Sequence, residues 1–196
     1  MLNVVLFGAP GSGKGTQSEK IAEVFALAHI STGDVLRKEI AADSDLGKLA
    51  KGYIDKGQLL PDGLIVDMLA KVLDAQKEGR GVIFDGFPRT LPQADALKKI
   101  LGERGTDVSV MIDLQVDEQE LIERLLERGR RSGRSDDNQE TIQSRLTVYH
   151  RQTAPLADYY RTAGKYVAVQ GQGTVDEVFA RISDVLANHC PTSSRP

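Results

Sequence analysis

Short, almost uniformly apolar runs alternate along this chain with longer stretches in which apolar residues recur every three or four positions. A uniform run such as 81–85 is typical of a strand that a parallel sheet buries on both faces, whereas the longer spacing, as in 62–72, predicts an amphipathic helix. The alternation predicts an α/β fold, a doubly wound five-stranded parallel sheet with right-handed crossovers. The expected strands are 2–7, 29–30, 81–85, 108–114 and 165–169.

Three segments depart from a simple alternation of strand and helix. No strand pattern interrupts 34–56, so this segment is expected to be a helical insert between two strands. Pro155 cannot continue a helix interior and breaks the long pattern in which it lies. The glycines, serines and arginines of 129–138 predict a mobile loop. A helix capped by Ser31 or Thr32 is expected to carry Val35, Leu36 and Ile40. The other expected helices are 14–26, 46–56, 61–72, 91–102, 117–128, 139–162 and 175–187.

The composition is that of a folded protein without a membrane span. The 196 residues suit one domain with inserted lobes, and a net charge of −3 gives no basic field for nucleic acid. There is no apolar run of about 18 residues, and 1–7 reads directly into a strand without a basic signal flank. Cys190 is the one cysteine, which excludes an internal disulfide and a cysteine-based zinc cluster. We therefore expect a cytoplasmic protein.

The strongest chemical signal is the glycine-rich stretch 8–16, between the first expected strand and the first expected helix. It reads Gly-Ala-Pro-Gly-Ser-Gly-Lys-Gly-Thr. Such a loop lets backbone N–H groups converge on a phosphate at a helix N-terminus, and Lys14 adds a full charge for the outer phosphates. Gly15 stands where the usual pattern has serine or threonine, and Thr16 follows. The stretch predicts a phosphate-binding loop; the alternative is a tight turn without a ligand.

Charged residues also follow two other expected strands. Asp85 ends a buried strand at the edge where open α/β sheets place ligands, and it could hold Mg²⁺ directly or through water. The alternative for Asp85 is a turn acid. Arg89 follows four residues later, and Arg37 lies one helical turn beyond 31–34. Because arginine binds phosphate with a planar fork, the two arginines predict a second anion site.

A third basic set lies in the last third of the chain. Alone, these arginines would indicate a solvated loop or an unspecific polyanion patch. Beside two phosphate sites they predict a lid that closes over a transferring phosphoryl group, neutralises its charge and excludes water. Asp136 and Asp137 could pair with Arg134 or hold the closed lid. The set consists of Arg128, Arg130, Arg131, Arg134 and Arg145.

Taken together, these motifs resemble the adenylate kinase family of nucleoside-monophosphate kinases, over residues 1 to about 187. The resemblance rests on the stretch 8–16, on Ser-Thr-Gly-Asp-Val-Leu-Arg at 31–37, on Asp-Gly-Phe-Pro-Arg-Thr at 85–90 and on Gly-Arg-Ser-Asp-Asp at 133–137. It implies reversible phosphoryl transfer from ATP to AMP, giving two ADP, in adenine nucleotide homeostasis. It also implies Mg²⁺ brought with ATP, no structural zinc, no nucleic acid or membrane partner, and a monomer.

The resemblance further implies a division of the chain and a role for each site residue. The core would be 1–30, 61–126 and 138–196, the AMP-binding lobe 31–60 and a short lid 127–137. The catalytic residues would be Lys14, Arg89, Arg128, Arg134 and Arg145. ATP would contact Gly11, Ser12, Gly13, Lys14, Gly15, Thr16, Arg128 (against the adenine) and Gly173. AMP would contact Thr32, Arg37, Gln58, Leu59, Leu60, Gly86, Phe87, Pro88, Arg89 and Gln93, with Arg134 and Arg145 clamping phosphates.

Two other functions stay open at this point. A uridylate/cytidylate kinase shares the fold and the short lid, but it tends to have alanine at the position of Thr32. Gln93 could hydrogen-bond an adenine edge, which also favours AMP. A P-loop nucleotide-binding module without transfer activity would need one nucleotide site, and Arg37 and Arg89 argue against it.

Overall fold

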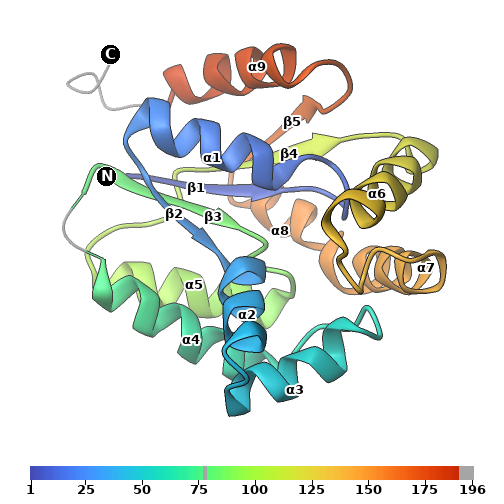
Figure 1. Cartoon of the computed structure of the whole chain (residues 1–196). Helices are drawn as coiled ribbons and strands as arrows, with labels where there is room; N and C mark the ends of the chain where they lie inside the picture. The colour runs from blue at the N-terminus through green and yellow to red at the C-terminus, as the bar shows by residue number, and fades with distance from the viewer. Residues whose placement is uncertain (77–78, 190–196) are drawn as a thin grey trace.

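The computed structural model describes residues 1–76 and 79–189. Within them, a five-stranded sheet runs through the centre of the molecule (Figure 1). Its strand order is β2-β3-β1-β4-β5, and every neighbouring pair is parallel, which confirms the predicted α/β class. Cys190 lies outside the described residues. The strands are β1 (Leu2–Phe7), β2 (Ala28–Ser31), β3 (Gly81–Asp85), β4 (Val110–Gln115) and β5 (Tyr166–Gln170).

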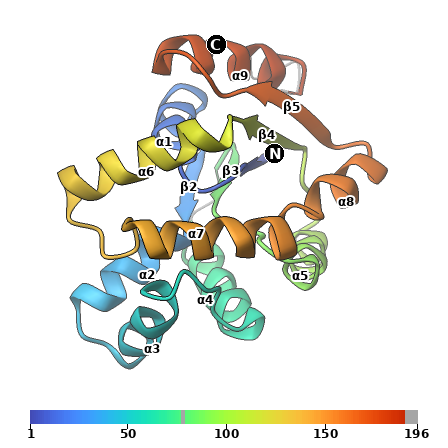
Figure 2. The same cartoon turned by 90° about the vertical axis from the view of Figure 1, so that its right-hand side faces the viewer.

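Helices cover both faces of the sheet. In Figure 1, α1 (Lys14–Phe25) and α9 (Val175–Ala187) lie above it, and α4 (Asp62–Ala75) and α5 (Leu91–Glu103) lie below it. Figure 2 looks onto the side where α6 and α7 lie, with α2 and α3 below them. The remaining helices are α2 (Thr32–Ala41), α3 (Asp45–Ile54), α6 (Glu118–Ser132), α7 (Gln139–Val148) and α8 (Leu156–Thr162). In the described part of the chain, no helix is both long and apolar enough to cross a membrane.

The central strand β1 shows why the strands are apolar on both faces. Val4 and Leu6 belong to a cluster that α1 and α9 complete, whereas Val5 and Phe7 belong to the cluster that α4 and α5 complete. Since successive side chains of a strand point to opposite faces, a strand covered twice needs apolar residues at each position. The sheet is therefore a rigid platform, and the loops at its carboxyl edge are free to carry polar groups.

The loop predicted at 129–138 is wrong in its first half, because α6 continues to Ser132 and its C-cap is Gly133. Glu127 accepts a hydrogen bond from Arg131 at 2.7 Å, and the Ser132 hydroxyl donates to the Arg128 carbonyl at 2.8 Å. Arginine is a good helix former, and Glu-to-Arg pairs four residues apart support a helix. The predicted end of this helix at Arg128 is therefore also wrong.

The predicted break near Pro155 is confirmed. After α7 the chain makes a wide π-helical turn over Tyr149–Thr153, in which Ala154 N–H donates to the Tyr149 carbonyl at 2.8 Å, and α8 begins after Pro155. The turn places the Thr153 hydroxyl against the Arg89 carbonyl, to which it donates at 2.8 Å. The π-helical turn after α7 is therefore hydrogen-bonded to the loop after β3.

Candidate active site

A cavity of about 770 Å³ lies at the carboxyl edge of the sheet. Its walls come from the loops after β1, β2, β3 and β5 and from arginines of α6 and α7. A volume of this size can hold more than one small ligand group, and the carboxyl ends of parallel strands are where α/β folds place ligands. Every site residue expected from the sequence lines this cavity, as does Asp85. Arg130 does not; its side chain is 77% exposed and pairs with Glu127.

The glycine-rich loop passes close to α6 before it enters α1. Gly11 has φ +87°, and a Cβ there would lie 2.9 Å from the Leu121 carbonyl oxygen, so a side chain would be both strained and obstructed. Helix α1 begins at Lys14 with no side-chain cap at Gly13. Its first N–H groups therefore point into the cavity as donors for an anion.

Lys14 is held inside this loop. Its Nζ donates to the carbonyls of Gly8 at 2.7 Å and Ala9 at 2.9 Å. Desolvation lowers the pKa of Lys14 to about 7; Asp85 opposes that shift, and the nearby arginines add to it. The protein alone thus stabilises the charged amine poorly. An anion in the cavity would favour the charged form and raise the pKa of Lys14 again.

Asp85 closes β3 beside the same loop. Its Oδ2 lies 3.6 Å from His29 Nε2 and would lie 3.7 Å from a Cβ built on Gly15. The carboxylate therefore faces the phosphate loop, and its oxygen is a ligand type that Mg²⁺ prefers. Among residues 1–76 and 79–189 there is no cluster of three metal-binding side chains. Asp85 thus has the chemistry to hold a magnesium ion.

Opposite the glycine loop, two side chains converge on Gly86. The Thr32 hydroxyl donates to the Gly86 carbonyl at 2.9 Å, and Arg89 Nε donates to it at 2.7 Å. Gly86 has φ +75°, and a Cβ there would lie 2.8 Å from Arg89 Nη2. Desolvation and Arg145 lower the pKa of Arg89. This guanidinium likewise lacks enough negative charge around it until an anion arrives.

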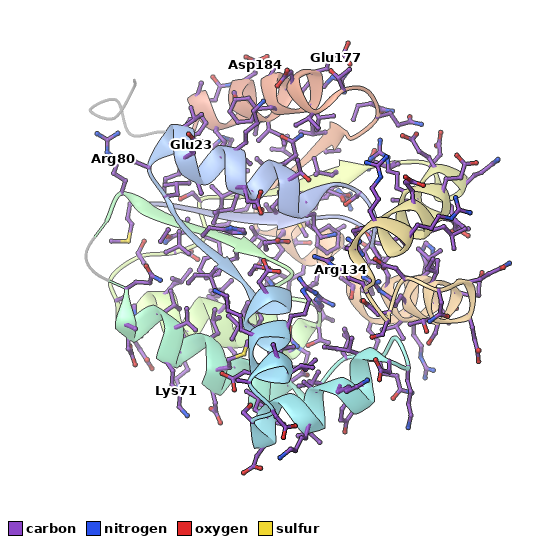
Figure 3. The ribbon with its side chains drawn as sticks, in the orientation of Figure 1. Glu23, Lys71, Arg80, Arg134, Glu177 and Asp184 are labelled. Atoms are coloured by element: carbon purple, nitrogen blue, oxygen red, sulfur yellow. The ribbon has the colours of Figure 1, made fainter. Side chains whose placement is uncertain are left out.

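Arg37 and Arg134 add cations to this side. Arg37 Nη2 contacts Asp34 Oδ1 at 2.5 Å. Burial, with the charges of Arg37 and Arg128, lowers the pKa of Arg134. Figure 3 labels Arg134 near the middle of the view, between α2 and the helices α6 and α7. Arg37 of α2, Arg89 of the loop after β3 and Arg134 of the loop after α6 thus line the same cavity.

Arg128 and Arg145 share one buried carboxylate. Arg128 Nε and Nη2 donate to the two oxygens of Asp137 at 2.6 and 2.8 Å, and Arg145 Nη1 donates to Asp137 Oδ1 at 2.7 Å. Arg145 also pairs with Asp136 at 2.8 Å. The two acids thus pair with Arg128 and Arg145 rather than with Arg134. Desolvation would lower the pKa of Arg128, but the hydrogen bonds and charge of Asp137 outweigh it and raise that pKa.

The loop between β5 and α9 forms the far wall, and here the sequence reasoning missed a residue. Arg124 lines the cavity beside Gly171 and Gly173, and its Nη2 donates to the Gly171 carbonyl at 3.3 Å. It lies four residues before Arg128 and so shares its helix face. The four-residue spacing from Arg128 could have indicated from the sequence that Arg124 also lines the site.

The parallel sheet, the glycine loop that opens α1 and the arginines opposite it define a P-loop protein that binds phosphates. Residues 6–165 match the model of the adenylate kinase family. The chain is 70% identical over 188 residues to the adenylate kinase of Parabacteroides distasonis, covering 96% of this chain and 99% of that one. It is 66% identical over 182 residues to that of Phocaeicola vulgatus (93% and 96%) and 52% identical over 186 residues to that of Porphyromonas gingivalis (95% and 96%). The chain therefore belongs to the adenylate kinase family and is a phosphotransferase that acts between ATP and AMP.

Proposed function

We propose that the cavity holds ATP and AMP at the same time, with their phosphates facing each other between the glycine loop and Gly86. The observation that carries this proposal is that two half-buried cations, Lys14 and Arg89, approach one cavity from different strand ends. Both have pKa values lowered by desolvation, so both gain most from an anion. One nucleotide would leave one of the two without a phosphate.

The donor half is built on the glycine loop. Residues 11–16 hold the ATP phosphates through the free N–H groups of α1, and Lys14 binds the outer ones. The base lies in the wall formed by Arg124, Gly171 and Gly173, with Gly173 meeting it through backbone groups. Arg128 lies between this wall and the phosphates. A guanidinium can cover an aromatic face, so Arg124 joins Arg128 as a residue that packs on the adenine.

The acceptor half is built on the loops after β2 and β3. Arg37 and Arg89 bind the AMP phosphate, Thr32 and Gln93 lie toward its base, and Gly86 allows close approach. The remaining contacts come from Gln58, Leu59, Leu60, Phe87 and Pro88.

Transfer then requires alignment and charge compensation, and no side chain needs to act as a base or nucleophile. Arg134, in the loop after α6, and Arg145, in α7, clamp the phosphates. With Lys14 they offset the charge that spreads over the transferring group. Asp85 would hold Mg²⁺ directly or through water, and the ion would offset negative charge on the ATP phosphates.

Two parts of the chain are proposed to move, the AMP-binding lobe 31–60 and the lid 127–137. The structure has them in contact, because the Ser135 hydroxyl of the lid donates to Asp55 of the lobe at 2.7 Å. The lobe also contacts α7, where the Ser144 hydroxyl donates to the Lys56 carbonyl at 2.8 Å. Closing these segments over the phosphates would exclude water, which otherwise would accept the phosphoryl group. Because one chain supplies every wall of the cavity, we propose that the protein is a monomer. We also propose that it acts in the cytoplasm.

A coupled assay with ATP and each of AMP, UMP and CMP tests the acceptor. We expect kcat/KM for AMP to exceed the other two by at least about a hundredfold, because a site built to hydrogen-bond one base rejects others strongly. Preferred turnover of UMP or CMP would contradict the proposal.

A further inference from the structure

The side-chain amide of Gln93 is fixed at both ends by the protein. Its Oε1 accepts a hydrogen bond from the Arg89 backbone N–H at 2.7 Å, and its Nε2 donates to Asp62 Oδ1 at 2.7 Å. A peptide N–H can only donate and a carboxylate can only accept. Turning the amide by half a turn would set N–H against N–H and oxygen against oxygen. The two anchors therefore allow one orientation.

Each end of the amide keeps one hydrogen-bonding position free for a ligand. The Oε1 atom has a second lone pair and the Nε2 atom a second hydrogen. Gln93 is 2% exposed and lines the cavity, whereas Asp62, at the start of α4, lies outside that lining. Gln93 thus presents one acceptor and one donor in a fixed order, and Asp62 sets that order without touching the ligand.

A fixed order of acceptor and donor distinguishes purines by the group at position 6. At its N1 edge adenine has a ring nitrogen that accepts beside a 6-amino group that donates, and a glutamine amide can pair with both. Hypoxanthine and guanine have a ring N–H and a 6-oxo group instead, so the amide would have to turn to pair with them. If the amide is fixed for adenine, a 6-oxo base places its ring N–H against the Nε2 donor of Gln93 and its 6-oxo group against the Oε1 acceptor.

We propose that Asp62 is a positioning residue that fixes the Gln93 amide and thereby makes the acceptor site select a 6-amino base over a 6-oxo base. The inference rests on the proposed function, because it takes the half-site beside Gln93 as the one that receives the monophosphate base. Hydrogen bonds to a charged group are stronger than those between neutral groups. Asp62 is therefore the firmer of the two anchors.

The test compares the dissociation constants of AMP and IMP, measured by titration calorimetry on the full chain without ATP. IMP differs from AMP in having the ring N–H and the 6-oxo group, so the ratio of the two constants reports the amide orientation. In Asp62→Ala we expect AMP to bind more weakly, IMP to bind more tightly, and the preference for AMP to fall by about tenfold, or about 1.4 kcal/mol. Asp62→Asn keeps the side-chain volume but can offer oxygen or nitrogen to Gln93, so it should lower the preference by a few-fold.

Thr90→Ala is the matched control. The Thr90 hydroxyl also donates to Asp62 Oδ1, at 2.9 Å, and caps α5. Its loss disturbs the same region but leaves the bond between Asp62 and Gln93, so the preference should stay at its wild-type value. A preference unchanged in both Asp62 variants, or lowered equally in Thr90→Ala, would overturn the inference. Failure of the wild-type chain to bind AMP would instead overturn the proposed function.

A double variant separates a positioning role from a general one. In a Gln93→Leu background the amide is absent, so Asp62→Ala should change the AMP-to-IMP preference no further. An equal loss of preference in the two backgrounds would show that Asp62 acts by another route, and the inference would be wrong.

Discussion

Replacing Lys14 with methionine tests the electrostatic account of the glycine loop through stability alone. Desolvation lowers the pKa of Lys14 from 10.5 to about 7 in the folded protein. Between these two values the unfolded chain carries a proton that the folded protein lacks. The free energy of unfolding of the wild type must therefore rise with pH in this window, relative to a variant that has no amine. Below pH 7 both states are protonated, and the folded state bears the full penalty of the charge.

The structure also gives the size of this effect. One proton corresponds to about 1.4 kcal/mol per pH unit where the two states differ fully. Since Lys14 is only half-buried, water screens part of the penalty, and we expect a rise of about 2 kcal/mol between pH 6 and pH 9. Methionine also leaves the carbonyls of Gly8 and Ala9 without their donor. That loss shifts the variant by a constant, because it does not depend on pH.

Urea unfolding of the two proteins across this pH range measures the difference. Lys20→Met is the matched control, because Lys20 belongs to the same helix and pairs at the surface with Asp176. A difference between wild type and Lys14→Met that stays flat, or that falls as pH rises, would refute the reasoning. It would mean that the loop already stabilises the charged amine without a phosphate.

Four further outcomes follow from the site. Lys14→Met should lower kcat by about a hundredfold or more, because it removes a charge that acts on the transferring group. Arg89→Ala should raise KM for AMP by about tenfold with little change for ATP, and Arg124→Ala should do the reverse; exchanged effects would mean that the two halves are assigned wrongly. Asp137→Ala leaves Arg128 and Arg145 without their shared carboxylate and should destabilise the protein by about 3 kcal/mol at neutral pH in urea unfolding. Burial alone would raise the pKa of Asp137, but Arg128 and Arg145 lower it. The stability that Asp137 contributes is therefore present above pH 3.8 and is lost as the pH falls below that value. A difference in unfolding free energy between wild type and Asp137→Ala that does not change with pH would contradict this.

The sheet and the phosphate loop could be predicted because their signals are local. A strand buried on both faces needs a continuous apolar run, as in β1 and β3, and a phosphate cradle needs glycines at fixed spacing just before a helix. The carboxyl edge then brings separate strand ends together, which is why Asp85, Arg89 and Lys14 could be placed at one site from the sequence.

The misplaced or missed features depend on contacts between side chains. Glycine and arginine content at 129–132 indicated a loop, but the pairing of Glu127 with Arg131 supports a helix there. The partners of Asp137 depend on how α7 returns against α6. Asp62 lies 31 residues before Gln93, and nothing in the spacing indicates that the start of one helix anchors a side chain of the next.

The measurement that tests the central claim most directly is the binding of a bisubstrate dinucleotide, two adenosines joined by a chain of phosphates long enough to bridge both halves. If the cavity holds ATP and AMP together, calorimetry should give one dinucleotide per chain, bound far more tightly than either nucleotide, because linking two ligands makes the second binding event intramolecular. Both AMP and ATP should then compete with it. A dinucleotide that binds no more tightly than ATP, and that ATP displaces while AMP does not, would show a single nucleotide site and contradict the account.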